Sequence, residues 1–316
     1  MEKLIVSSSP HIKTKDTTQG IMRDVLIALA PATVAGIVLF GWRALVTVLV
    51  CVASAVLSEF IFNLICKRRQ TVNDLSAAVT GLILALCLPA KTEIWQSIVG
   101  SVFAIIVVKC LFGGIGSNFA NPAATARVFM LVAFASSVGG GSATVFSDLT
   151  ASATPLEIIK YDKGQTLPSL LDMLIGNRMG AIGETCAIAL VLGGVYLIVR
   201  KVISWHTPVI YIGTVFVLSL LIKQDLTVAL YQVLGGGLII GAFFMATDYV
   251  TTPINKYGKM VFAFGCGLIT VLLRFWGSYP EGVSFAILLM NILAPYIEKW
   301  CTRKPLGKAG KKNEKV

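Results

Sequence analysis

A run of small and hydroxyl side chains follows a single acid at positions 148–156, where the sequence reads DLTASATPL. Asp148 opens the run, Ser152 lies in its middle, and Thr154 stands directly before a proline. Small neighbours leave the Thr154 hydroxyl sterically open, so a modifying enzyme could attach a group to its oxygen. A Ser/Thr/Ala-rich stretch is also typical of a plain solvated loop, and its surroundings in the chain must decide between the two.

The elements that carry this run are expected to be apolar helices. Hydrophobic residues make up 56% of the chain and charged residues 14%, against about 25% charged in ordinary globular proteins. Backbone polar groups in lipid must bond within the protein, so apolar runs of about 20 residues predict membrane-crossing helices. Ten segments are expected, near 25–41, 44–65, 75–89, 94–112, 122–138, 180–199, 207–222, 226–245, 260–277 and 282–298.

The ten segments fall into five before and five after one long connection. With the N-terminus placed inside, twenty of the 27 Lys and Arg residues fall on the inner side, as the positive-inside rule requires. We therefore expect both termini in the cytoplasm and Thr154 on the outer side of the membrane. The expected parts are an N-terminal segment 1–21, a five-helix repeat 22–138, an extracytoplasmic loop 139–179, a second five-helix repeat 180–300 and a basic tail 301–316.

Acidic residues within or beside the apolar segments need a reason to be there, because a charge at the bilayer centre costs about 2.5–3.5 kcal/mol on insertion scales. We interpret Asp24 as an interfacial partner of Arg23, whereas Glu59 could equally be a functional acid or a packing acid paired to a Lys or Arg near a helix end. Glu184 precedes a threonine at the start of the sixth segment, and Asp248 stands among threonines after the eighth. These two positions are candidate oxygen-rich sites.

The sequence contains no motif typical of a metal-binding or nucleotide-binding site. The seven cysteines are scattered singly, and the two histidines are far apart in the chain. Iron–sulfur and zinc sites use close Cys or His pairs, and nucleotide sites use glycine-rich fingerprints that do not occur here. The apolar segments also leave no room for a cytoplasmic redox domain, so we do not expect the chain to oxidise NADH or ferredoxin by itself.

Taken with its neighbours, the Thr154 run resembles a known motif. The chain is similar to the membrane subunits of Rnf complexes and of Na⁺-translocating NADH:quinone reductases. Its short N-terminus, with SPHI at 9–12, resembles the D-subunit branch of Rnf complexes, whereas Ser152 departs from the glycine that is commoner before Ala-Thr. The matching segments are DLSAAVTGL at 74–82, GGIGSNFANPAATAR at 113–127, DLTASATPL at 148–156, GET at 183–185 and ATDYVTTP at 246–253.

The resemblance implies a cofactor, a fold and partners. Thr154 would carry FMN through a phosphoester bond, with Thr144 of a second Ser-Ala-Thr triplet as the weaker alternative, and family members also hold non-covalent riboflavin. The fold would be an inverted repeat similar to urea and ammonium channels, in a prokaryotic inner membrane. The chain would relay electrons between ferredoxin and NAD⁺, coupled to Na⁺ or H⁺ translocation. Its partners would be a flavin transferase and other Rnf subunits, which supply iron–sulfur clusters, an NADH site and a second covalent flavin.

Three residues are candidates for secondary roles toward a flavin. Arg127 could offer charge to a flavin phosphate or to a reduced isoalloxazine, or it could be a basic anchor at a helix end. Glu184 and Asp248 could bind a flavin ring, polarise it during reduction or coordinate Na⁺, and the sequence does not choose among these.

A different class of function fits the same helices. A channel or secondary transporter without redox chemistry would also use apolar spans with broken helices, and a purely structural scaffold for redox partners is a third reading. Covalently bound flavin would distinguish an electron-relaying subunit from a channel or transporter and from a scaffold.

Overall fold

The computed structural model describes residues 17–139, 154–161, 167–178 and 180–302, and all regular elements in these ranges are helical. Asp148, Ser152, Thr144 and both ends of the chain lie outside the described residues. The first-half helices are α1 Thr18–Phe40, α2 Trp42–Ile65, η1 Val72–Asp74, α3 Ser76–Leu86, α4 Ile94–Val102, η2 Phe103–Cys110, α5 Pro122–Ala133 and α6 Ala135–Val138. The later helices are α7 Pro155–Tyr161, α8 Leu170–Ile175, α9 Ala187–Val199, α10 His206–Lys223, α11 Leu226–Leu234, α12 Leu238–Ile240, η4 Gly241–Met245, α13 Lys256–Trp276 and α14 Val283–Cys301.

Helices occupy each of the ten apolar segments expected from the sequence. Five of them, α1, α2, α10, α13 and α14, are long and apolar enough to cross a membrane. Together, α11 and the following α12 and η4 are also long and apolar enough, as a broken span or a re-entrant loop that bends by 60° at the break. The remaining segments contain shorter apolar helices, namely α3, α4 with η2, α5 and α9. The chain is therefore an all-helical polytopic membrane protein over its described residues.

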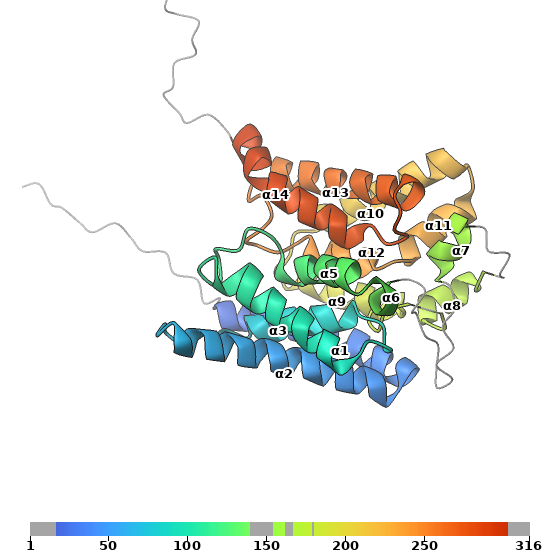
Figure 1. Ribbon diagram of the computed structural model, residues 1–316. Helices are drawn as coiled ribbons and strands as arrows, with labels where there is room; N and C mark the ends of the chain where they lie inside the picture. The colour runs from blue at the N-terminus through green and yellow to red at the C-terminus, as the bar shows by residue number, and fades with distance from the viewer. Residues whose placement is uncertain (1–16, 140–153, 162–166, 179, 303–316) are drawn as a thin grey trace, which may run out of the picture.

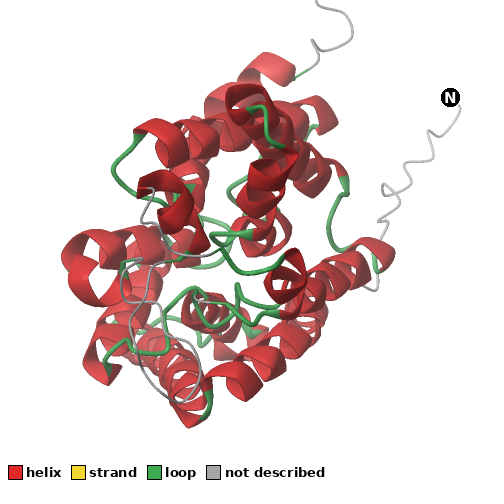
Figure 2. Ribbon diagram, turned by 90° about the vertical axis from the view of Figure 1, so that its right-hand side faces the viewer, coloured by secondary structure: helices red, strands yellow, loops and turns green. Residues whose placement is uncertain are grey.

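Several helix contacts in the first half of the chain have counterparts in the second half. In the first half α2 packs against α3 and α4, and α5 packs against α4. In the second half α10 packs against α11 and α13, and α14 packs against α13. The halves meet where α1 contacts α9 and where α5 contacts α14. Figure 1 shows α2 along the lower edge and α13 and α14 along the upper edge, and Figure 2 gives the same helices in a view turned by 90°.

Two expected helices differ from the expectation: one begins seven residues late, and the other breaks in its middle. The segment expected over 180–199 becomes helical only at Ala187, because the chain before it bonds to the first half: the Ile182 N–H donates to the Leu88 carbonyl (3.0 Å) and the Gly183 N–H to the Leu86 carbonyl (2.7 Å). The segment 226–245 breaks after α11, where Gly236 and Gly237 have φ of +63° and +66°. Only glycine adopts this left-handed backbone without strain, so the glycine cluster sets the position of the break.

The segment expected over 122–138 is also divided. Helix α5 begins at Pro122, with the Asn121 side chain accepting hydrogen bonds from the Ala123 and Ala124 N–H groups (3.0 and 3.1 Å), an N-cap that the Asn-Pro pair favours. Phe134, at φ −127° and ψ 45°, ends this helix before the short α6.

Candidate functional site

Thr154 caps the short helix α7. Its hydroxyl oxygen accepts a hydrogen bond from the Glu157 N–H (3.3 Å), and its own N–H donates to the Glu157 carboxylate (3.2 Å). This is a capping box, and the proline at the next position suits the first turn of a helix. Thr154 is only 6% exposed. The sequence had predicted an open hydroxyl, and the structure instead places it in a buried cap.

Helix α7 is seated on the second half of the chain. The Leu156 side chain fills a niche beside Gly235 and Gly236: a Cβ on Gly236 would stand 2.3 Å from Leu156 Cδ1. The Lys160 ammonium donates to the carbonyls of Gly277 (2.6 Å) and Tyr279 (3.0 Å), just beyond the end of α13. Partial burial lowers the pKa of Lys160. These contacts fix α7 beside the break between α11 and α12.

Two buried arginines bind the carbonyl end of α11. Arg274 donates to the carbonyls of Gln232, Gly235 (3.0 Å) and Gly236 (3.1 Å). Arg178 donates to the Leu234 carbonyl (2.7 Å) and to the Glu184 carbonyl. Helix carbonyls left without intrahelical partners carry partial negative charge, and a guanidinium satisfies several of them at once. The half-helix α11 can therefore end inside the molecule without water.

A small cavity of about 20 Å³ lies next to this end of α11 and is lined by Arg127, Glu184 and Glu281. Arg127 forms an ion pair with Glu281 (2.8 Å) and also donates to the Val138 carbonyl (3.2 Å). Glu184 is buried, and its carboxylate faces the helix break, since a Cβ on Gly237 would stand 3.8 Å from Glu184 Oε2. The volume holds about one water molecule.

Charged groups of both signs lie close to α7. The arginines Arg127, Arg178 and Arg274 lie in this region with the carboxylates of Glu184 and Glu281, and Glu157 of α7 adds a third carboxylate. A Cβ on Gly236 would stand 2.8 Å from Arg274 Nη2 as well as against Leu156, so this arginine lies beside α7 itself. A guanidinium in a poorly hydrated place stabilises an anion near it.

A second cavity, of about 110 Å³, lies among α1, α3, α9 and η4. Asp248 lines it and does not lie in the cavity of Glu184, so the structure separates the two candidate acids into different sites. Its carboxylate accepts hydrogen bonds from the Thr251 hydroxyl (3.2 Å) and the Val250 N–H (3.3 Å). The Asn118 side-chain oxygen, also at this cavity, is buried without a partner among the described residues.

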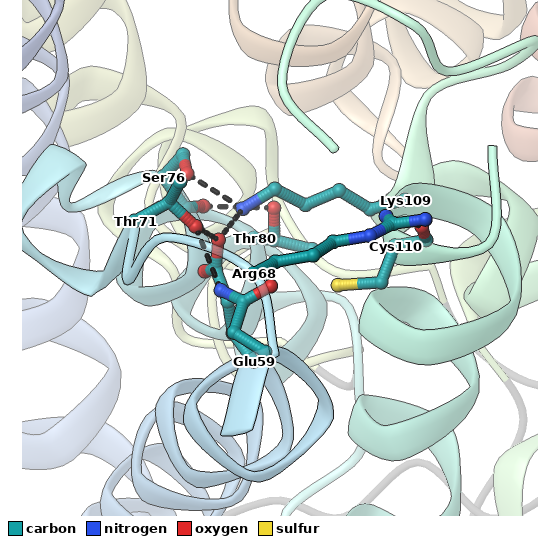
Figure 3. A network of polar contacts seen from close by, with 8 residues as sticks. Glu59, Arg68, Thr71, Ser76, Thr80, Lys109 and Cys110 are labelled. Atoms are coloured by element: carbon teal, nitrogen blue, oxygen red, sulfur yellow. Dashed lines mark hydrogen bonds and ion pairs between the residues drawn. The ribbon is translucent and has the colours of Figure 1, made fainter. Parts of the chain in front are cut away.

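Lys109 lines the same cavity and belongs to a buried polar network (Figure 3). Its ammonium lies 2.9 Å from Glu59 Oε1 and 2.7 Å from Ser76 Oγ, and the Thr71 hydroxyl donates to the same Glu59 oxygen (2.6 Å). Both charged side chains are at most 3% exposed. The other carboxylate oxygen, Glu59 Oε2, is buried without a partner in the part of the chain that the structure describes.

The structure tests the pairings expected from the sequence. Glu59 pairs with a lysine as expected. Asp24 was expected to pair with Arg23, but its ion-pair partner is Arg200 (3.1 Å), because α1 packs on α9 and brings the end of α9 beside it. Arg127 is 3% exposed and bound to Glu281, so it is not a simple surface anchor at a helix end.

Sequence reasoning missed three residues of the central cluster: Arg178, Arg274 and Glu281. The same rule that singled out the membrane acids would have found Arg274, since it lies inside an apolar segment where a charge is costly. Arg178 lies near the end of the long connection 139–179, and Glu281 lies in the short connection before the last apolar segment. The sequence carries no signal that either side chain turns inward.

Comparison with known proteins gives consistent matches over nearly the whole chain. The sequence model of the NQR2, RnfD, RnfE family matches residues 5–307. A relative from Acetobacterium woodii, named as the D subunit of a Na(+)-translocating ferredoxin:NAD(+) oxidoreductase complex, is 44% identical, covering 96% of this chain and 95% of that relative. One from Clostridium ljungdahlii, the D subunit of a proton-translocating ferredoxin:NAD(+) oxidoreductase complex, is 39% identical over 93% of each chain. A third, from Halorhodospira halophila and named as the D subunit of an ion-translocating oxidoreductase complex, is 34% identical over 95% of each.

Proposed function

Because the chain belongs to the NQR2, RnfD, RnfE family, we propose that it is the D subunit of an Rnf-type complex, an ion-translocating oxidoreductase that moves electrons between ferredoxin and NAD⁺. It would act with other Rnf subunits, which supply the iron–sulfur clusters, the NADH site and a second covalent flavin. Relatives at 44% and 39% identity are named for Na⁺ and for protons respectively, so the proposal covers cation translocation without choosing the ion.

Within that complex, Thr154 would hold FMN as a phosphoester, attached by a flavin transferase. The capping geometry supports this assignment, because the Thr154 hydroxyl oxygen takes part in the cap only as an acceptor. Replacing its hydrogen with phosphorus leaves that oxygen in place for the Glu157 N–H. When bound, FMN would supply the centre that accepts and releases electrons.

The observation that carries the proposal is the seating of α7 beside Arg274. Leu156 lies against Gly236, and Arg274 donates to the carbonyl of the same glycine. This chain's contribution to electron relay would be to hold α7 in that place and to stabilise negative charge there. Arg127 would act through the field at the cavity, since its hydrogen bonds are taken by Glu281 and Val138.

Non-covalent riboflavin would have a place at the second cavity. The unpartnered Asn118 oxygen and the Asp248 carboxylate supply polar groups there, while Phe243 and Phe244 supply apolar walls. The cavity of about 110 Å³ is smaller than the 300 Å³ or more that organic ligands usually occupy. A neighbouring open groove of about 410 Å³ shares Asn118 with it, so the ring would have to extend into that groove.

The helix contacts that the two halves share support a repeat, and we propose two inverted five-helix repeats with ten crossings, as in urea and ammonium channels, in a prokaryotic inner membrane. Five helices before the 139–179 connection would put Thr154 on the outer side and both termini in the cytoplasm. A cysteine introduced near Lys163, in a chain freed of its native cysteines, should then react with an impermeant thiol reagent in intact cells. Protection from the reagent there contradicts this orientation.

The test of the redox proposal is co-expression with a flavin transferase, followed by ultraviolet fluorescence of the denatured band. A fluorescent band at the size of this chain is the expected result. Its absence in the presence of an active transferase would favour the channel or secondary transporter, since such a protein needs no bound flavin.

A further inference from the structure

The seated position of α7 conflicts with the chemistry of flavin attachment at Thr154. An attacking oxygen must come within about 3–3.5 Å of the phosphorus, aligned with the bond that breaks. Thr154 is 6% exposed, and the next three residues along α7 are buried as well. A bulky flavin nucleotide bound to its transferase cannot reach this hydroxyl while α7 is seated.

The contacts that seat α7 are separate from those that cap it. The capping box joins Thr154 only to Glu157, within the same short segment. Seating depends on Leu156 in the glycine niche, on Lys160, whose ammonium binds carbonyls beyond the end of α13, and on Tyr161, whose hydroxyl donates to the Ser278 carbonyl (2.9 Å). The two capping hydrogen bonds lie within one short segment, so they need not break when Leu156 and Lys160 leave their partners, and seating can be weakened without changing Thr154.

We propose that α7 is a detachable carrier, modified while it is away from its seat and returned to it afterwards, with Lys160 and Leu156 as the positioning residues that decide between the two states. This inference rests on the proposed attachment of FMN to Thr154. In the attachment step the threonine oxygen bonds to the flavin-side phosphorus of a flavin adenine dinucleotide. The bond between its two phosphates breaks, AMP leaves, and the hydroxyl proton passes to a base of the transferase.

Seating would also set where the bound flavin stands. Lys160 holds the C-terminal end of α7 at Gly277 and Tyr279, while Leu156 holds its N-terminal end beside Arg274. The groups that Leu156 and Lys160 contact lie directly after α11 and α13, two helices of the second half of the chain. Return of α7 to this seat brings Leu156 back against Gly236, beside Arg274.

The test uses the full-length chain without flavin, folded in detergent, with purified flavin transferase, flavin adenine dinucleotide and Mg²⁺. The initial rate of fluorescent labelling is compared for wild type, Lys160→Met and Leu156→Ala. Lys91→Met, at an exposed lysine elsewhere, is the matched control. We expect both seating variants to be labelled about tenfold faster than wild type, which corresponds to a loss of roughly 1.4 kcal/mol of seating, and the control to match wild type.

Equal or slower labelling of folded seating variants overturns the carrier proposal. If Lys160→Met fails to fold, Lys160→Arg takes its place, since it keeps the positive charge in a longer side chain. Its labelling rate should lie above that of wild type and below that of Leu156→Ala. Thr154→Val in the same assay separates the carrier proposal from the attachment site: undiminished labelling there refutes the attachment site itself. Amide exchange of residues 155–161, faster in Lys160→Met than in wild type, gives a readout that needs no flavin.

Discussion

Replacing Lys109 with methionine tests the buried ion pair of Figure 3 most sharply. The Glu59 carboxylate would keep one hydrogen bond, from the Thr71 hydroxyl, and would lose its counter-ion, while its second oxygen already has no partner in the described structure. Removing one member of a buried pair costs about 3–5 kcal/mol, because the other charge is left uncompensated. With both side chains at most 3% exposed, we expect Lys109→Met to fall in that range.

The double variant Glu59→Gln/Lys109→Met should recover part of this loss, because no charge remains buried. A coupling energy of about 0.5–3 kcal/mol is expected for residues in one network. The free energy of unfolding would be measured by reversible denaturation in mixed micelles, with Lys91→Met as an exposed-lysine control near zero. A cost below about 1 kcal/mol for Lys109→Met, or a double variant as unstable as the sum of the single ones, refutes the reasoning.

Three further predictions concern the cluster, the helix break and the outer surface. Glu184→Gln should raise the midpoint potential of the bound flavin and Arg127→Gln should lower it in a spectroelectrochemical titration, since one removes negative and the other positive charge; shifts of the same sign contradict the field argument. Gly236→Ala should lower the melting temperature more than Gly237→Ala: both glycines are left-handed, but only a Cβ on Gly236 meets neighbours closer than 3 Å, an overpacking cost of about 1–3 kcal/mol. A hydrogen bond from the Ser169 side chain lowers the pKa of Asp172, so α8 is stabilised above the unfolded pKa near 4 and loosens as the pH falls through the lower folded value. The protection factors of the α8 amides, which correct for the pH dependence of intrinsic exchange, should fall there in wild type and change little in Asp172→Asn.

The sequence predicted the positions of the helices well, because the length of an apolar run can be read directly from one sequence. It predicted the pairing of Glu59 with a basic residue for a similar reason, as a buried membrane charge needs a partner. It did not predict which partner Asp24 would take, since Arg200 lies far away in the chain and arrives only through the packing of α1 on α9.

At the candidate site, too, local features were predicted and long-range contacts were not. Residues 148–156 pointed to Thr154 as the proposed attachment position, but the seating of α7, in which this hydroxyl is buried, depends on Leu156 and Lys160 meeting distant glycines and carbonyls. Arg178 and Glu281 were missed because each turns inward from a connection whose path the sequence does not encode locally. Asp148 and Ser152 lie outside the described residues, so their roles stay predictions.

The central claim is that Thr154 carries FMN. The most direct measurement is mass spectrometry of proteolytic peptides from the chain purified after co-expression with its flavin transferase, alongside Thr154→Ala and Thr144→Ala variants. We predict an FMN-sized mass increase on the peptide that contains Thr154, kept in Thr144→Ala and lost in Thr154→Ala. An unmodified Thr154 in wild type, or a Thr154→Ala chain that fluoresces as strongly as wild type, would contradict it.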